Sequence, residues 1–242
     1  MHEAMKRDHK QQELNFLAST SYENKDYQAA EIYYNRLIGM DPKEHSYHSQ
    51  FSFALRLQGK LSQALESVDK AIALNPQDAK LYWMRAATMK SFACKEKGLS
   101  IVGRREVFAN SIPFEHTSLS LDPTSEEAWL DLIESMLCVH DFVGAIGELG
   151  RSNKYVQRMR LIWAFLGCLA FILSGREVDA DLNAIFFDPE ARFNDWCLIE
   201  LESLLQDLEQ EEFFPDRVRK AQQFMDHFID RKSNGGILVR LR

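Results

Sequence analysis

Residues 61–76 read Leu-Ser-Gln-Ala-Leu-Glu-Ser-Val-Asp-Lys-Ala-Ile-Ala-Leu-Asn-Pro. Apolar and small residues recur in this stretch every three or four positions, which predicts an amphipathic helix, and Pro76 cannot continue it. A related stretch lies 34 residues earlier, at residues 27–42, with Ala30 in the place of Ala64 and its own closing Pro42. A period of 34 residues predicts helix-turn-helix units that stack on one another.

Tryptophans continue this period through the second half of the chain. Trp163 follows Trp129 by 34 residues, and Trp196 follows Trp163 by 33. Around Trp163 the sequence is Trp-Ala-Phe-Leu-Gly-Cys-Leu-Ala. This pattern resembles the tetratricopeptide repeat family, whose first helix carries Trp, Leu, Gly and Tyr at fixed spacing and whose second carries a small residue and a closing Pro. Here Ala170 takes the place of the Tyr.

The resemblance implies an all-α fold, an α-solenoid in which repeats wind into a right-handed superhelix. Pro123 follows Pro76 by 47 residues instead of 34, so about thirteen residues are inserted into the third repeat. The expected organisation is a polar lead-in at 1–10, a solenoid of about five repeats at 11–190 with the insertion near 92–104, a degenerate sixth repeat and closing helix at 191–232, and a tail at 233–242.

Two charged clusters lie outside the repeat pattern. The inserted stretch carries Lys95, Lys97, Arg104 and Arg105, which favour either a solvated helix extension or an element that contacts a partner. The acidic run at 209–212 precedes Phe213-Phe214-Pro215 and indicates a solvated junction between two helices.

Composition and charge narrow the classes of partner. The net charge of −7 argues against a nucleic-acid-binding domain, which usually has a clustered basic face. Residues 161–175 are uncharged, but a membrane-spanning helix needs about 18 to 20 such residues. The first residues are charged and lack the apolar stretch of a secretory signal. We therefore expect a cytoplasmic protein that binds neither nucleic acid nor membrane.

Nothing in the sequence indicates catalysis, a cofactor or a metal. Phosphate-binding glycine loops, the serine nucleophile motif and the His-Glu-x-x-His zinc motif are absent. The four cysteines are scattered and form no Cys-x-x-Cys pair. His45 and His48 are three residues apart, but no acidic or sulfur side chain accompanies them in a metal-ligand pattern. We expect a protein that is not an enzyme.

In this family the first helices of successive repeats line a concave groove, one position away from the core-facing residues. For repeats one to three, this offset predicts a peptide-binding strip suited to a protein or peptide partner with acidic and apolar side chains. The strip consists of Tyr22, Phe53, Arg56, Lys80, Trp83 and Lys90. A core position between repeats is the alternative for Phe53 and Trp83. In repeat four the same offset gives Leu130, Glu134 and Leu137.

Some members of the family grip the acidic C-terminus of heat-shock chaperones with a clamp of Lys, Asn and Arg residues. The corresponding positions here are Asn15, Ser19, Gln50, Lys80 and Met84. Because Lys80 alone matches, this chain lacks the converging cations and amides that hold two carboxylates. The sequence therefore argues against a chaperone co-factor.

Two functions remain open at this point. The first is a non-enzymatic scaffold or adaptor that binds a peptide segment in the concave groove. The alternative is a structural or assembly subunit that docks through apolar C-terminal repeats, either on another folded chain or on a second copy of itself as a homo-oligomer. Phe171 and Ile172 favour this alternative because they fall on the expected groove face of repeat five. A closing helix at residues 215–231 could also cover these two side chains.

Overall fold

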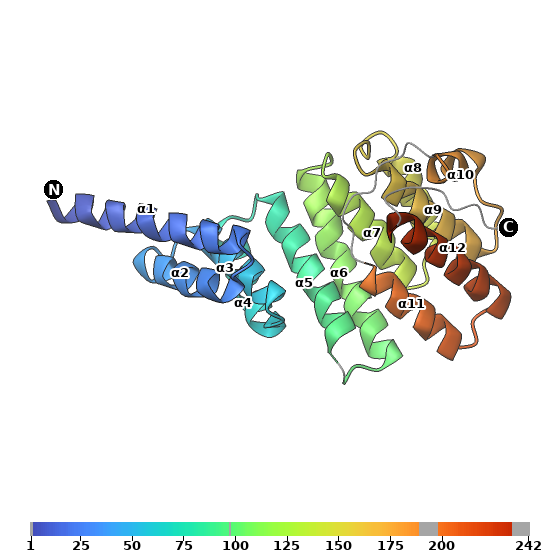
Figure 1. Ribbon diagram of the computed structural model, residues 1–242, viewed down its shortest axis with the longest axis horizontal. Coiled ribbons are helices and arrows are strands. Elements are labelled where there is room, and N and C mark those ends of the chain that lie inside the picture. The colour runs from blue at the N-terminus through green and yellow to red at the C-terminus, as the bar shows by residue number, and fades with distance from the viewer. Residues whose placement is uncertain (1, 97, 189–197, 234–242) are drawn as a thin grey trace. The chain divides into compact units, whose positions relative to one another are not determined.

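The computed structural model describes residues 2–96, 98–188 and 198–233 of the 242-residue chain. Every regular element in these residues is a helix (Figure 1). The expected all-α fold is therefore confirmed. The chain divides into two compact units, Met1–Lys95 and Glu96–Arg242.

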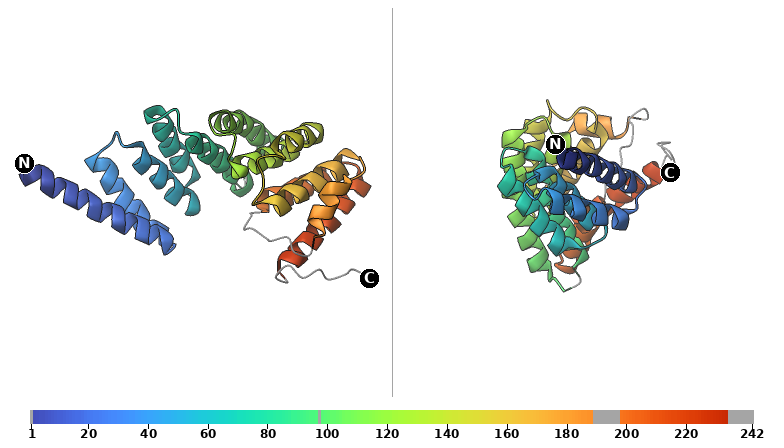
Figure 2. Two further views of the ribbon diagram at one scale, coloured as in Figure 1. Left: turned by 90° about the horizontal axis from the view of Figure 1, so that it is seen from above. Right: turned by 90° about the vertical axis from the view of Figure 1, so that its left-hand side faces the viewer.

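Unit 1 consists of two complete helix pairs and the first helix of a third. Consecutive helices run antiparallel and pack against one another (Figures 1 and 2). The first helix already begins at His2, so the expected lead-in at 1–10 belongs to it from that residue on. The helices are α1 (His2–Glu23), α2 (Tyr27–Met40), α3 (His45–Leu57), α4 (Leu61–Leu74) and α5 (Ala79–Lys95).

The second helix of each of the first three repeats ends in the same way. Asp41, Asn75 and Asp122 follow these helices with φ between −140° and −136° and ψ between 81° and 91°. Each precedes a proline, whose ring disfavours helical geometry at the preceding residue. The spacing of the Asp/Asn-Pro pairs in the sequence therefore translates directly into the positions of the helix ends.

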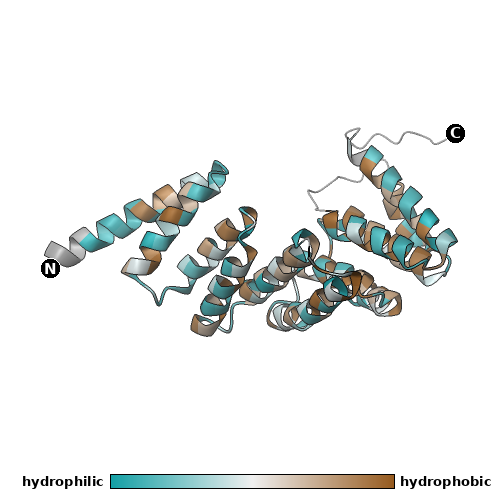
Figure 3. Ribbon diagram, turned by 90° about the horizontal axis from the view of Figure 1, so that it is seen from below, coloured by the Kyte–Doolittle hydropathy of each residue, from teal (hydrophilic) through white to brown (hydrophobic). Residues whose placement is uncertain are grey.

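Small residues allow close helix packing inside unit 1. Ala30 in α2 and Ala64 in α4 are both fully buried, as their matching places in the repeat predict. Next to Ala64, the Ser52 hydroxyl of α3 donates a hydrogen bond of 2.8 Å to the Ala64 carbonyl. In Figure 3 the helices carry apolar residues on one side and hydrophilic residues on the other. The repeat pattern thus selects which face of each helix enters the core.

Unit 2 contains the remaining helices. The inserted residues of repeat three lengthen helices instead of forming a long loop, because α5 has 17 residues and α6 has 21, whereas α3 and α4 have 13 and 14. The helices of unit 2 are α6 (Ile101–Leu121), α7 (Glu126–Cys138), α8 (Phe142–Ser152), α9 (Arg160–Ser174), α10 (Ala180–Phe186), α11 (Ile199–Gln210) and α12 (Pro215–Ser233).

Helix α9 forms the centre of unit 2, and Leu161 to Ala170 are all buried. The Trp163 indole donates a hydrogen bond of 2.8 Å to the Ser152 hydroxyl of α8. A methyl group at Gly167 would lie only 2.9 Å from a methyl carbon of Leu182 in α10. The Trp-Leu-Gly pattern around Trp163 therefore marks a point where helices approach closely.

Four phenylalanines join α9, α10 and α12. The Phe165 ring centroid lies 4.1 Å from that of Phe228, and the Phe186 centroid lies 4.3 Å from that of Phe224. Phe165, Phe186 and Phe228 are at most 1% exposed. Residues 215–231 thus form the predicted closing helix, which covers one side of α9 (Figure 1).

Within the described residues, no helix combines the length and apolar character that crossing a membrane requires. Five sequence features lie outside these residues: Lys97, Pro189, Trp196, Cys197 and the tail after Ser233.

Candidate functional site

A pocket of about 540 Å³ opens on unit 1 between residues of α1, α2, α3 and α5. Its volume is within the range of sites that hold small molecules or side chains of a peptide. The lining residues are Asn15, Ser19, Tyr22, Glu23, Tyr34, Ser46, Tyr47, Gln50, Phe53, Lys80 and Met84.

Aromatic rings form the apolar part of this pocket. Tyr22 and Phe53 meet edge to face with ring centroids 5.5 Å apart, which joins α1 to α3. Burial raises the pKa of the Tyr22 hydroxyl, as does the neighbouring Tyr27, and burial also raises the pKa of Tyr34. Both hydroxyls therefore remain protonated at neutral pH and can donate hydrogen bonds to a ligand.

Polar groups surround these rings. The Gln11 amide donates a hydrogen bond of 2.8 Å to the Tyr47 hydroxyl, which fixes this ring at the edge of the pocket. Lys80 is exposed and takes part in no ion pair within the described residues. Glu23 supplies one negative charge to the same pocket. The arrangement can offer a cation, amides and hydroxyls to a ligand whose apolar groups contact the rings.

Comparison with known proteins supports the repeat assignment. A sequence profile of the family described as "Tetratricopeptide repeat" matches residues 14–44, which span most of the first helix pair. The chain has a tetratricopeptide-repeat fold. No curated protein sequence matches the chain.

Three solved structures, two of which are described as TPR proteins, have a similar fold at low sequence identity. YrrB, described as a TPR protein with an unusual peptide-binding site, is 12% identical with a TM-score of 0.56, over 78% of this chain and 89% of YrrB. A thermophilic TPR protein of Thermus thermophilus, TTC0263, is 13% identical with a TM-score of 0.57, over 89% and 98%. MamA is 12% identical with a TM-score of 0.54, over 84% and 93%. At such identities the similarity shows the fold alone.

The tetratricopeptide-repeat positions that correspond to the chaperone clamp all lie in the pocket of unit 1. These residues are Asn15, Ser19, Gln50, Lys80 and Met84. The residues that the sequence aligns with the clamp therefore meet in this pocket, and their side chains differ from those of the clamp. A single lysine with uncharged neighbours cannot provide the paired charge-assisted hydrogen bonds that two carboxylates need.

The structure places the six residues of the predicted strip in four different settings. Tyr22, Phe53 and Lys80 line the pocket. The Arg56 guanidinium lies 4.7 Å from the centre of the Phe53 ring, at the border of the pocket. Trp83 is absent from the lining and packs with Phe53 against the core cluster of α4 and α5, which was the alternative left open for it.

Lys90 is the member of the predicted strip that the structure contradicts. Its side chain is only 2% exposed and does not line the pocket. Lys90 lies three positions after Ala87, which is also buried, and residues three apart lie on the same face of a helix. The one-position offset from the core-facing residues fails for Lys90. Side chains in the final turns of α5 are more buried than those in the first helices of repeats one and two.

Sequence reasoning missed several lining residues, notably Tyr34 in α2 and Tyr47 in α3. A signal for Tyr34 was present, because it follows the buried Ala30 by four residues and therefore lies on the same inward face. Tyr47 precedes Gln50 by three residues, so these two side chains also share a helix face. The prediction considered one position per helix turn and left out such neighbours.

The groove face predicted for repeat four is closed. Leu130, Glu134 and Leu137 in α7 are at most 2% exposed. Helix α11 packs against α7, and the Cys138 thiol donates a weak hydrogen bond of 3.8 Å to the Glu200 carbonyl in α11. Binding at this face of α7 would require α11 to move.

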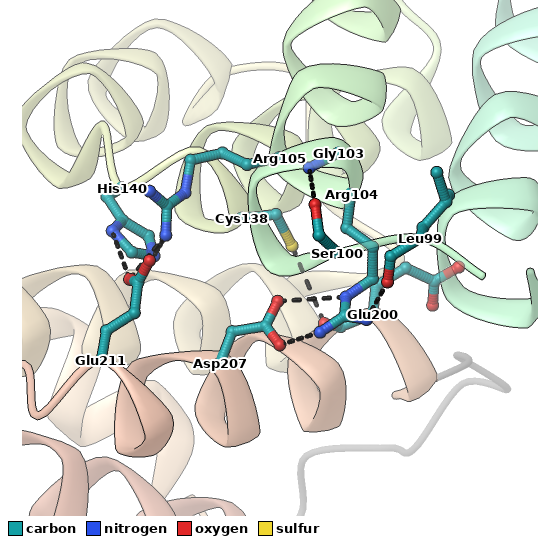
Figure 4. A network of polar contacts seen from close by, with 10 residues as sticks. All are labelled: Leu99, Ser100, Gly103, Arg104, Arg105, Cys138, His140, Glu200, Asp207 and Glu211. Atoms are coloured by element: carbon teal, nitrogen blue, oxygen red, sulfur yellow. Dashed lines mark hydrogen bonds and ion pairs between the residues drawn. The ribbon is translucent and has the colours of Figure 1, made fainter. Parts of the chain in front are cut away.

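Two arginines of α6 hold α11 in place (Figure 4). Arg104 forms a bidentate ion pair with Asp207, in which its Nε lies 3.2 Å from Oδ2. Arg105 lies 2.6 Å from a carboxylate oxygen of Glu211 and 3.3 Å from the His140 ring nitrogen Nε2. We call these four charged residues and His140 the α6–α11 clasp. The arginines of the inserted stretch are therefore used inside unit 2.

The α6–α11 clasp should weaken in acid because of His140. Burial lowers the pKa of His140 and Arg105 lowers it further, while Glu211 and Asp207 act in the opposite direction. The unfolded chain therefore takes up this proton at a higher pH than the folded chain. We expect the free energy of unfolding to fall as pH decreases below about 6.5, the ordinary histidine value.

The control for this pH effect is His140→Asn. His140 has φ of 64°, a left-handed conformation that asparagine tolerates better than most residues. Urea unfolding at pH 7 and pH 5 should show a smaller loss of stability for this variant than for the parent. An equal loss in both proteins would mean that His140 does not contribute to the acid sensitivity.

Proposed function

We propose that the protein is a non-enzymatic adaptor that binds a short segment of another protein in the pocket of unit 1. The supporting observation is the pocket itself, since residues of four helices place aromatic rings, amides and a lysine around one cavity. The peptide-binding site named for YrrB, which has the same fold, is consistent with this proposal.

The chemistry of the pocket favours a segment with apolar side chains and one acidic group. Tyr22 and Phe53 provide apolar contact area, and aromatic residues often dominate the binding energy of such interfaces. Lys80 and the adjacent Arg56 attract a carboxylate, whereas Glu23 limits the number of negative charges that the pocket accepts. A segment with one carboxylate fits this set better than the doubly acidic ligands of the chaperone clamp.

Reversal of the two positive charges is expected to weaken binding. Arg56→Glu with Lys80→Glu should lower affinity for partners captured from native cell extract by about tenfold or more, because like charges then face the acidic group. Parent binding should also weaken between low and physiological salt. The measurement is quantitative mass spectrometry of captured proteins, followed by titration of the retained partner at two salt concentrations.

The matched control moves the same change in charge away from the pocket. Lys43 and Lys70 are exposed, do not line the pocket, and form no ion pair within the described residues. Lys43→Glu with Lys70→Glu should therefore leave the captured proteins unchanged. If both double variants keep their helical circular dichroism and bind as the parent does, the pocket is not the binding site.

The proposed adaptor role involves no chemical step. Within the residues that the structure describes, no group of three His, Cys, Asp or Glu side chains could hold a metal ion. Burial raises the pKa of the Cys168 thiol to about 12, so this thiol stays protonated at neutral pH and is a poor nucleophile. The proposal therefore rests on the contacts that the pocket of unit 1 offers and requires no cofactor.

The alternative role, assembly through the apolar C-terminal repeats, has less support. Phe171 and Ile172 are partly buried, and α12 covers one side of α9 through Phe224 and Phe228. The partial burial of Phe171 and Ile172 leaves less apolar area for docking. We further propose a cytoplasmic protein without nucleic-acid or membrane partners, in line with the net charge of −7.

A further inference from the structure

A second cavity, of about 530 Å³, lies in unit 2 beside the C-terminal end of α8. We call it the α8-end pocket. None of its lining residues is acidic, although the whole chain has a net charge of −7. These residues come from the first part of α7, from the end of α8 and from the segment that follows α8. They are Trp129, Gly150, Arg151, Asn153, Lys154 and Tyr155.

The segment that forms this pocket is basic. Residues 151–160 include four cations and no acidic residue. Arg158 is used inside unit 2, where its guanidinium pairs with the carboxylates of Glu126 and Glu127. Arg160 is used as well, because it donates hydrogen bonds of 3.3 and 3.4 Å to backbone carbonyl groups just after α8. Arg160 thereby supplies the positive charge that favours the C-terminal end of a helix.

The other two cations of this segment, Arg151 and Lys154, line the pocket. The Arg151 side chain is 70% exposed, and its ion pair with Glu148 uses Nη1 at 3.0 Å. Lys154 is exposed and forms no ion pair within the described residues, while its Nζ lies 4.5 Å from the centre of the Tyr155 ring. Both cations can therefore bind an anion while their present contacts stay in place.

Two aromatic rings give the pocket a fixed wall. Tyr155 stacks on Trp129 with ring centroids 5.7 Å apart and an interplanar angle of 12°. The Trp129 indole donates a hydrogen bond of 2.9 Å to the Pro123 carbonyl, which holds this ring in place. Within the described part of the chain, neither the Tyr155 hydroxyl nor the Asn153 side-chain amide forms a hydrogen bond. The pocket thus combines two cations with two uncharged donors.

This set of donors suits the carboxylates of a short acidic segment. Arginine binds a carboxylate through two parallel hydrogen bonds, and lysine binds one as a point charge. A long polyanion such as nucleic acid fits less well, because a chain with a net charge of −7 repels it. Trp129 is also only 8% exposed, which leaves little of its ring for a base to stack on.

We propose that the α8-end pocket binds an acidic segment of a partner protein through two neighbouring Asp or Glu side chains. One carboxylate pairs with Arg151 and the other with Lys154. The Tyr155 hydroxyl and the Asn153 amide donate hydrogen bonds to the remaining carboxylate oxygens. This site belongs to unit 2 and does not depend on the peptide site proposed for unit 1.

Fluorescence anisotropy with a defined probe tests the proposal in the full chain. The probe is a fluorescein-labelled peptide with a run of glutamates, and the control peptide has glutamines in their places. Arg151→Gln with Lys154→Gln should weaken binding of the glutamate peptide by about tenfold or more, because both cations are lost. The matched control is Arg176→Gln with Lys220→Gln, which removes an exposed arginine and an exposed lysine outside the pocket. This control should bind as the parent does, and both double variants should keep the helical circular dichroism of the parent.

Two further measurements locate the bound probe. Arg56→Glu with Lys80→Glu should leave the affinity for the glutamate peptide unchanged, because these residues belong to the pocket of unit 1 and its border. Carbodiimide treatment joins an amine to a carboxylate in direct contact and should link Lys154 to a glutamate of the probe. Lys154→Arg should abolish this link, which mass spectrometry detects, and should preserve the affinity because the charge is kept.

Three results would overturn the proposal. Equal affinity of the parent and of Arg151→Gln with Lys154→Gln would show that the probe does not bind in this pocket. Equal binding of the glutamate and glutamine peptides to the parent would show that no acidic group is recognised. A labelled oligothymidylate that binds more tightly than the glutamate peptide, and loses affinity in the same double variant, would assign the pocket to single-stranded nucleic acid.

Discussion

Replacement of Phe165 with alanine is expected to lower the free energy of unfolding by about 3–5 kcal/mol, the usual cost of removing a buried phenylalanine ring. Phe165 is fully buried and stacks on Phe228 with ring centroids 4.1 Å apart. It also faces Phe186 and Phe224, so the cavity is lined by rigid rings that cannot easily fill it. The contact between α9 and α12 would lose its central side chain.

Urea unfolding measured by tryptophan fluorescence checks this expectation. Trp129 and Trp163 belong to unit 2, whereas Trp83 belongs to unit 1, so the signal mainly reports the unit that contains Phe165. The control is Phe214→Ala, which removes the same atoms from a side chain that is 56% exposed. Similar unfolding midpoints for the two variants would mean that α12 does not depend on the Phe165 ring.

The sequence predicted those features of the fold that depend on neighbouring residues alone. The residues before Pro42, Pro76 and Pro123 end helices because of the proline ring, and the small residues Ala30 and Ala64 are buried where the repeat places them. Tyr22, Phe53 and Lys80 line the pocket, also for a local reason. Within regular repeats, one offset along the first helix determines which way these side chains point.

What the sequence could not predict depends on contacts between distant residues. Arg104 and Asp207 are 103 positions apart, and no local pattern shows that α11 packs against α6 and α7. The same packing closes the predicted groove face of α7, where Leu130 and Glu134 are buried. Lys90 departs from the prediction for a related reason, because the helical offset placed it on the groove face, whereas the packing around α5 leaves its side chain only 2% exposed.

Removal of Arg104 is expected to destabilise unit 2 through the partner that it leaves behind. Side-chain exposure is 22% for Arg104 and 12% for Asp207, so both charges are largely removed from water. In Arg104→Met the Asp207 carboxylate remains largely enclosed without its cation. Breaking a buried pair costs about 3–5 kcal/mol, and the residual exposure reduces our expectation to about 2–4 kcal/mol.

The double variant Arg104→Met with Asp207→Leu distinguishes the cost of an unpaired charge from the loss of an attraction. Replacing both partners with apolar residues of similar size is often neutral, so the double variant should unfold within about 1 kcal/mol of the parent. Arg105→Met is a second comparison, because Arg105 and Glu211 are each 31% exposed and such a pair contributes only about 0–1 kcal/mol. Urea midpoints of the three variants provide the measurement. If the single and double variants at Arg104 lose the same stability, the ion pair itself holds α11 against α6, and desolvation of Asp207 is not the dominant effect.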